Sequence, residues 1–175
     1  MTEVRAMDHR ARAAIGRHPI HPMIIPFPIA FLVAAFVSDL IAVFGGSDFW
    51  MVASFWLLGA GWVTGLIAGF FGAAELLLVP KATKLLAAWF HAATAVPAVL
   101  LALVNWFIRY DDGGPATDYS PVLGAVLSGL TVALLLVAGW LGGHLTYVHR
   151  VGVTPASEEP VPREPGYGRI RSGNA

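Results

Sequence analysis

Four long apolar stretches, separated by short breaks of Gly, Pro, Asp and Lys, make up most of the chain. A helix that spans a membrane needs about 20 predominantly apolar residues. Four stretches meet this length: about Met23 to Phe44, Phe49 to Val79, Leu85 to Ile108 and Pro121 to Val148. Because the breaks are short, consecutive stretches should pack antiparallel. The pattern predicts an all-α fold, an integral membrane four-helix up-down bundle that forms one domain over residues 18–150.

Composition agrees with a membrane protein and excludes other classes. Of the 175 residues, 57% are hydrophobic and 13% are charged, whereas an average soluble domain carries about 25% charged residues. So few charges cannot cover a water-soluble globule, and the lipid bilayer is the expected partner. A formal net charge of zero provides no basic field for nucleic acid. The absence of Cys excludes disulfides and cysteine-ligated iron–sulfur clusters.

Basic residues are distributed unevenly between the two ends of the predicted bundle. If both termini lie on one side, that side holds ten of the eleven Lys and Arg residues, and the other side holds only Arg109. Positively charged loops stay in the cytoplasm, so both termini should be cytoplasmic. Residues 1–17 would form a basic segment, either a helix on the membrane surface or a frayed tail. Residues 151–175 are rich in Pro, Gly and Glu, which predicts a disordered cytoplasmic tail.

Small residues recur on one face of the second stretch. Gly61, Gly65 and Gly69 are four residues apart, a spacing that lets membrane helices approach closely. This stripe predicts close packing, either within the bundle or between copies in a homo-oligomer. Pro97, inside the third stretch, should kink that helix or free a backbone carbonyl.

Three ionisable residues lie at one depth inside the predicted spans. Glu75, His91 and His144 are five, seven and six residues from Pro80, Lys84 and Arg150, which lie at the cytoplasmic ends of their stretches. These separations correspond to about 8–11 Å at 1.5 Å per residue. Ionisable groups in a membrane are costly and usually face the protein interior. We therefore predict one cytoplasmic-side cavity that contains these three side chains, with His21 and His18 at its mouth. The alternative is that each side chain reaches the headgroups or hydrogen-bonds a neighbouring carbonyl.

Two further polar residues, Asp39 and Asn105, lie towards the opposite side of the membrane. We expect them to form hydrogen bonds between helices, or to cap a helix end, rather than to form a second site.

The segment His18–Ile29 is unusual because it contains four prolines. Four prolines cannot all lie within one regular helix, so the helix proper should begin near Pro28 after a broken start. Backbone of that kind is tolerated at membrane depth only where protein covers it. Either His18 and His21 fold over the mouth of the bundle, or the segment is a rigid interfacial anchor.

The two ends of the membrane region resemble a known family. HPIHPMIIPFPIAFLVAAFVSDLIA at the start and GWLGGHLTYVHRVGV at the end are similar to the bacterial membrane family called domain of unknown function 2231. The resemblance covers about His18 to Val153. It implies a four-helix protein of the bacterial cytoplasmic (inner) membrane without an assigned activity. Relatives that carry a Rieske iron–sulfur domain imply an association with electron transfer.

Several functions remain compatible with the polar cluster. Haem b would bind between His91 and His144, with Glu75 orienting one imidazole. A metal such as Zn, Fe or Mn would use His21, Glu75, His91 and His144, and a proton or small-solute pathway would use the same groups as a relay. A scaffold or partner subunit would need none of these, and no nucleophile–base pair or phosphate-binding loop indicates an enzyme. The sequence predicts a scaffold or partner subunit, with a redox partner or a second copy, and leaves haem, metal and transport as alternatives. The association of this subunit with membrane electron transfer is what the family resemblance implies.

Overall fold

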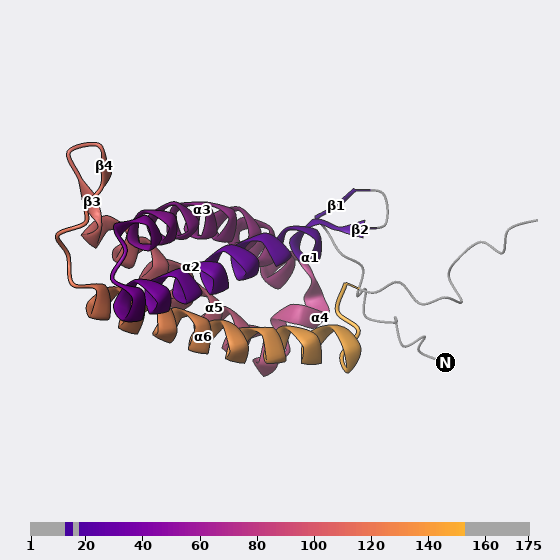
Figure 1. Cartoon of the computed structure of the whole chain (residues 1–175). Helices are drawn as coiled ribbons and strands as arrows, with labels where there is room; N and C mark the ends of the chain where they lie inside the picture. The colour runs from indigo at the N-terminus through magenta and orange to yellow at the C-terminus, as the bar shows by residue number, and fades with distance from the viewer. Residues whose placement is uncertain (1–12, 16–17, 153–175) are drawn as a thin grey trace, which may run out of the picture.

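The computed structural model describes residues 13–15 and 18–152, most of which lie in long helices. The four long helices are α2 (Pro26–Gly45), α3 (Asp48–Leu78), α5 (Leu86–Ile108) and α6 (Pro121–Tyr147). Figure 1 also shows two short helices and two small hairpins: α1 (Ile20–Ile24), α4 (Pro80–Thr83), β1 (Ala14–Ile15) with β2 (His18–Pro19), and β3 (Tyr110–Asp111) with β4 (Gly114–Pro115). Most of the basic segment and of the tail expected from the sequence lies outside the described residues.

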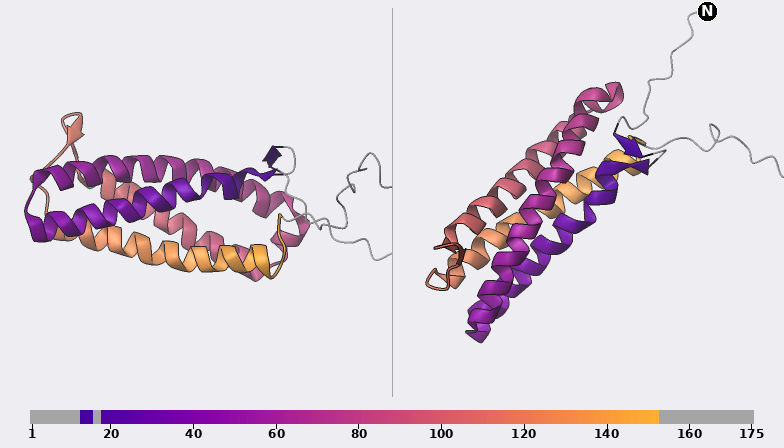
Figure 2. Two further views of the ribbon diagram at one scale, coloured as in Figure 1. Left: turned by 45° about the vertical axis from the view of Figure 1, so that its right-hand side comes forward. Right: turned by 90° about the horizontal axis from the view of Figure 1, so that it is seen from above.

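The long helices run up and down in chain order and form a ring of neighbours. α2 packs on α3, α3 on α5, α5 on α6, and α6 on α2 (Figure 2). α3 and α6 therefore lie across the diagonal of the bundle from each other. We call the end that carries α1 and α4 the proximal end, and the end that carries the β3–β4 hairpin the distal end. The predicted all-α up-down bundle is confirmed.

Local sequence explains where the long helices begin and end. α2 begins at Pro26, a position in the first turn where a missing N–H leaves no helical hydrogen bond unmade. It ends before Gly46, whose φ of +61° suits glycine and whose N–H donates to the Ala42 carbonyl. α6 is capped by Ser120, whose Oγ accepts from the Leu123 N–H at 3.4 Å.

The proline-rich segment interrupts the first helix only at Ile25, which keeps helical φ and ψ of −50° and −35°, and helical structure already begins at Ile20. α1 ends at Ile24 and α2 begins at Pro26, two residues earlier than the expected start. In contrast, Pro97 lies within α5, which continues on both sides of it.

The interior is packed through small residues, as the stripe in the second stretch predicts. A Cβ at Gly61 would lie 2.5 Å from Leu32 Cδ2, and one at Gly65 would lie 2.9 Å from Val99 Cγ2. A Cβ at Gly69 would meet nothing within 4 Å. Gly61 and Gly65 therefore make contacts within the bundle, whereas Gly69 lies at its surface.

Large apolar side chains cover the outside of the helices. Phe44, Phe70, Leu136 and Trp140 are each more than 70% exposed. The four long helices, the first taken together with α1, are long and apolar enough to cross a membrane. Such a surface is stable against lipid and not against water, so the chain is a multi-pass membrane protein.

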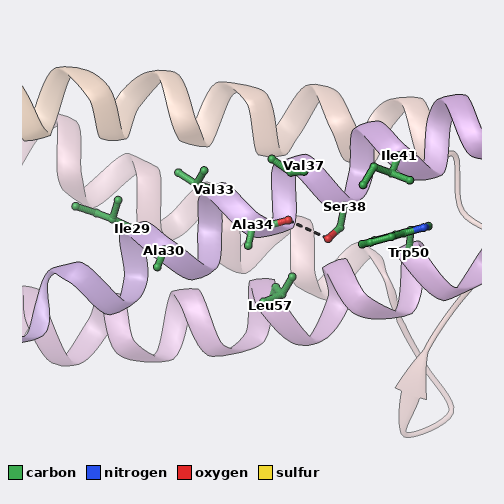
Figure 3. A pocket seen from close by; sticks show the side chains of 9 residues that line it. All are labelled: Ile29, Ala30, Val33, Ala34, Val37, Ser38, Ile41, Trp50 and Leu57. Atoms are coloured by element: carbon green, nitrogen blue, oxygen red, sulfur yellow. Dashed lines mark hydrogen bonds between the residues drawn. The ribbon is translucent and has the colours of Figure 1, made fainter.

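A shallow apolar groove of about 600 Å³ runs along α2 (Figure 3). Ile29, Val33 and Ile41 of α2 face Trp50 and Leu57 of α3 across it. The Ser38 hydroxyl in this groove donates to the Ala34 carbonyl of its own helix at 2.9 Å. The groove therefore offers lipid chains an apolar surface with its one hydroxyl already bonded.

Candidate functional site

Polar side chains gather at both ends of the bundle. The proximal group contains His21, Glu75 and His91, and the distal group is centred on Arg109. The two groups differ in their hydrogen bonding. The guanidinium at the centre of the distal group has an acceptor for every N–H, whereas the proximal group contains polar atoms that have no partner among the described residues.

His21 is carried by α1 and lies against α3. Its Nδ1 is 2.7 Å from the Ala68 carbonyl oxygen. Its ring also lies over Gly72, where a Cβ would be 2.9 Å from the His21 Cε1 atom. Because a carbonyl oxygen can only accept, Nδ1 must carry a proton, and in the neutral imidazole Nε2 then has a free lone pair.

His91 has the same arrangement on the opposite wall. It belongs to α5, and its Nδ1 is 2.8 Å from the Ala138 carbonyl oxygen of α6. Its ring lies over Gly142, where a Cβ would be 3.3 Å from Cε1. The same donor–acceptor reasoning assigns the proton to Nδ1 and leaves Nε2 with its lone pair.

The two imidazoles lie near each other inside the proximal end. Their ring centres are 6.3 Å apart, and their planes are inclined at 87°. Because His21 is anchored on α3 and His91 on α6, the pair spans the diagonal of the bundle. Among the described residues, neither Nε2 atom has a hydrogen-bond partner.

Glu75 lies beside this pair but does not bond either ring. Its Oε1 accepts from the Ala13 N–H at 2.9 Å, and its Oε2 is buried without a partner among the described residues. Backbone carbonyls, and not Glu75 as expected, orient the two imidazoles. Glu75 instead ties the segment before β1 to the proximal end of α3.

The structure does not bring His144 into this group. His144 is exposed, and its ring contacts His149, with ring centres 4.9 Å apart. The inward face of α6 follows Ser128, Thr131 and Ala138 to Gly142, so a residue two positions later points elsewhere. That helical spacing can be read from the sequence, and it places Gly142 rather than His144 on the inward face of α6. His18 is also exposed and lies in β2.

The proximal group offers two nitrogen ligands rather than a complete metal site. Within residues 13–15 and 18–152, no three His, Asp or Glu side chains are placed to hold a metal ion. The expected set of His21, Glu75, His91 and His144 for Zn, Fe or Mn is therefore not assembled. Two neutral imidazoles can still complete the coordination of an iron that already has four porphyrin nitrogens.

The distal group is built around Arg109, which is completely buried. Its NH1 and NH2 groups donate to the two oxygens of Asp39 at 2.7 and 2.8 Å. NH1 also lies 2.8 Å from Ser54 Oγ and 3.1 Å from the Tyr119 hydroxyl. Nε and NH2 both donate to Asn105 Oδ1, at 3.0 and 2.9 Å. All five guanidinium N–H groups therefore have acceptors.

The partners of Arg109 join all four long helices. Asp39 lies in α2, Ser54 in α3 and Asn105 in α5. The Ser128 hydroxyl of α6 donates to Asp39 Oδ2 at 2.6 Å, and Asn105 donates to the Gly124 carbonyl of α6 at 3.3 Å. Breaking a buried ion pair of this kind is costly, because the remaining charge has no compensation. The group acts as a clamp at the distal end.

Tyr119 joins this clamp from the loop between β4 and α6. Burial raises the pKa of its phenol, and the neighbouring Arg109 charge partly opposes that rise. The Arg109 guanidinium also lies over the ring, 4.9 Å from its centre, so Tyr119 joins the clamp through both its hydroxyl and its ring.

The hydrogen bonds of Asp39 and Asn105 to α6 confirm the expected contacts between helices. The distribution of basic residues predicts only a loop charge at Arg109, and the buried role of its side chain differs from that prediction. The signal was its spacing: Arg109 follows Asn105 by four residues, which places both on one helix face.

Comparisons with known proteins agree with this architecture. A family described as "Predicted membrane protein (DUF2231)" matches residues 17–155. Neither the curated proteins nor the solved structures provide a match.

Proposed function

This chain belongs to the DUF2231 family of predicted membrane proteins, and we propose that it is a membrane electron-transfer partner subunit that binds haem b between His21 and His91. The observation that carries the proposal is the shared anchoring of the two rings. Each imidazole donates its Nδ1–H to a backbone carbonyl of the wall behind it. Histidines that ligate metals are usually held in this way, because the bond fixes the tautomer and the ring orientation.

The separation of the rings supports haem. His21 and His91 would hold the iron of one haem together only if their rings lie within a few ångströms of each other. The observed separation is 6.3 Å. Gly72 and Gly142, beside the rings, keep large side chains away from both.

A porphyrin also explains why two protein ligands suffice. Zn in a protein site takes four ligands, usually three or four of them from the protein, and the described residues provide no third ligand. A bound haem would supply one-electron exchange. The chain would contribute two neutral imidazoles and an apolar bundle around them.

A scaffold without a cofactor is the second candidate, and the distal clamp favours it. Arg109 and its partners join the four long helices, which stabilises a rigid bundle whether or not anything binds at the proximal end. The carbonyl bonds of His21 and His91 also pin α1 to α3 and α5 to α6. We further propose that the proximal end faces the cytoplasm, because the basic residues concentrate on the side of the termini.

The test is the visible absorption spectrum of the full chain, expressed with haem precursors and purified in detergent. We expect a Soret band and, after reduction, the sharp band of a six-coordinate low-spin haem, with one haem per chain. His21→Ala and His91→Ala should each lose this spectrum. His144→Ala is the matched control and should keep it, because His144 is exposed and lies away from the pair.

A folded wild-type chain that stays colourless, even after haemin is added, would overturn the haem proposal and leave the scaffold. A spectrum that survives His21→Ala and His91→Ala would place the haem elsewhere. Folding is monitored by circular dichroism and by the elution volume, so that loss of haem is separated from loss of structure.

A further inference from the structure

We propose that Glu75 is a positioning residue for His21 and acts on it through backbone hydrogen bonds. The inference rests on the proposed function only for the identity of the ligand that His21 binds. The positioning itself concerns the apoprotein and is tested separately.

A continuous chain of contacts leads from Glu75 to His21. The Ala13 N–H donates to Glu75 Oε1 at 2.9 Å. The carbonyl of the same residue accepts from the Ile20 N–H at 3.0 Å, and Ile20 begins α1 directly before His21. Between these bonds, β1 pairs with β2 in the register Ala14 with Pro19. The Glu75 carboxylate of α3 therefore fixes Ala13, directly before β1, and Ala13 in turn fixes Ile20, the first residue of α1.

α1 needs such support because it is not stable by itself. It has five residues, and its N-cap position is Pro19, with no side-chain cap. Isolated helices shorter than about 12 residues are marginal in water because nucleation is costly. At its C-terminal end α1 continues into α2 through Ile25, whose φ and ψ are helical, so α2 sets its direction there. Its N-terminal end, which carries His21, is held by tertiary contacts: the Glu75 chain, the His21–Ala68 bond, and the contact of Pro19 with Gly152 beyond α6.

The bonding of Glu75 also argues against a purely packing role. One of its oxygens bonds Ala13, and the other is buried without a partner among the described residues. A buried carboxylate oxygen without a partner is unfavourable, so an apolar residue at this position would pack at lower cost. An apolar residue, however, would provide no acceptor for the Ala13 N–H.

The positioning can be measured directly because the chain has no Cys. Ile15→Cys and Leu78→Cys introduce two exposed labelling sites, one on β1 and one at the end of α3. Spin labels at these sites report the distance from the hairpin to α3 by pulsed electron paramagnetic resonance. We expect a narrow distance distribution in the otherwise wild-type chain and in Glu75→Gln, whose amide oxygen still accepts. Glu75→Leu, which lacks the acceptor, should give a broad distribution.

The second measurement is haemin affinity in the unlabelled chain. Loss of one hydrogen bond to a charged acceptor corresponds to about tenfold in affinity, so Glu75→Leu should bind haemin about tenfold more weakly. Glu75→Gln should restore an affinity close to wild type. Leu77→Ala, on an exposed side chain of the same turn, is the matched control and should change neither measurement. Glu75→Ala serves in place of Glu75→Leu if the leucine variant does not fold.

The outcomes separate the two proposals. A narrow distribution in the Glu75→Leu or Glu75→Ala chain would overturn the positioning role. Equal haemin affinity in wild type and in Glu75→Leu would also overturn it, while leaving the proposed function intact. A distribution that broadens as expected, in a chain that never binds haemin, would support positioning and reject the proposed function.

Discussion

Removing either charge of the buried Arg109–Asp39 pair should strongly destabilise the bundle. Arg109→Met leaves the Asp39 carboxylate, which is 1% exposed, with only the Ser128 hydroxyl as a described partner. Breaking a buried ion pair by removing one partner costs about 3–5 kcal/mol. Asp39→Leu should cost a similar amount, because it leaves the guanidinium buried without its counter-ion.

The double variant Asp39→Leu/Arg109→Met tests the origin of this cost. Replacing both members of a buried pair by apolar groups is often nearly neutral, although Ser54, Asn105 and Ser128 would each lose a bond worth about 1 kcal/mol. We therefore expect the double variant to cost about 1–3 kcal/mol, several kcal/mol less than the sum of the single costs.

Tyr119→Phe provides a graded comparison. NH1 of Arg109 has two protons and three acceptors, of which the Tyr119 hydroxyl is the most distant, at 3.1 Å. Its loss should cost about 1 kcal/mol or less. Asp112→Asn, which removes an exposed carboxylate at the same end, should change stability by less than about 0.5 kcal/mol.

The assay is reversible unfolding of the detergent-solubilised chain in SDS, followed by circular dichroism. The reasoning would be refuted if Arg109→Met and Asp39→Leu each lowered the free energy of unfolding by less than about 1 kcal/mol and if these losses were additive in the double variant. That is the size expected of an ordinary polar contact between membrane helices, which averages about 0.6 kcal/mol, and it would mean that the ion pair is not effectively desolvated.

Three further predictions follow from particular positions. Gly61→Ala should destabilise the chain by about 1–3 kcal/mol in the same assay, because the added Cβ meets Leu32. Gly69→Ala is the control and should be neutral or stabilising by up to about 1 kcal/mol. Equal effects of the two substitutions would contradict the close contact of Gly61 with Leu32. Above about pH 10, stability should fall as pH rises, because the raised pKa of Tyr119 means that the folded state holds the phenol proton longer than the unfolded state does. Tyr119→Phe should show a smaller fall, and an unchanged pH profile would exclude this contribution. Reporter fusions after residues 46, 80, 114 and 150 should alternate outside, inside, outside and inside; an outside signal at 150 would reverse the proposed orientation.

The spans were predictable because the signal for them is local. Each needs only a run of apolar residues of sufficient length, and the observed helices begin and end within about three residues of the expected limits. Gly46 and Pro121 mark helix ends through their own backbone preferences. These features depend on neighbours in the sequence and not on the rest of the fold.

The sequence predicted only some of the residues that form the proximal group. His91 lies against Ala138 and Gly142, small residues of α6, whereas Glu75 bonds the Ala13 N–H. His144 lies at a similar depth but faces away from the bundle, and His21, expected only at the mouth, is the residue beside His91. Gly142 and Gly143, which precede His144, leave space beside its side chain but do not determine the direction in which that side chain points.

By itself, the sequence determined how many helices are long and apolar enough to cross a membrane, how far along its helix each polar residue lies and which residues share a helix face. Only the tertiary structure decided which faces meet. Depth and face belong to a single helix, whose rise and turn are constant, whereas a contact also requires the rotation and separation of two helices relative to each other. For this reason the sequence indicated Asp39 and Asn105 as polar contacts but did not identify Arg109 as their common partner. Its guanidinium reaches Asp39 because α2 and α5, although not neighbours in the ring, present these residues to the same point on the bundle axis.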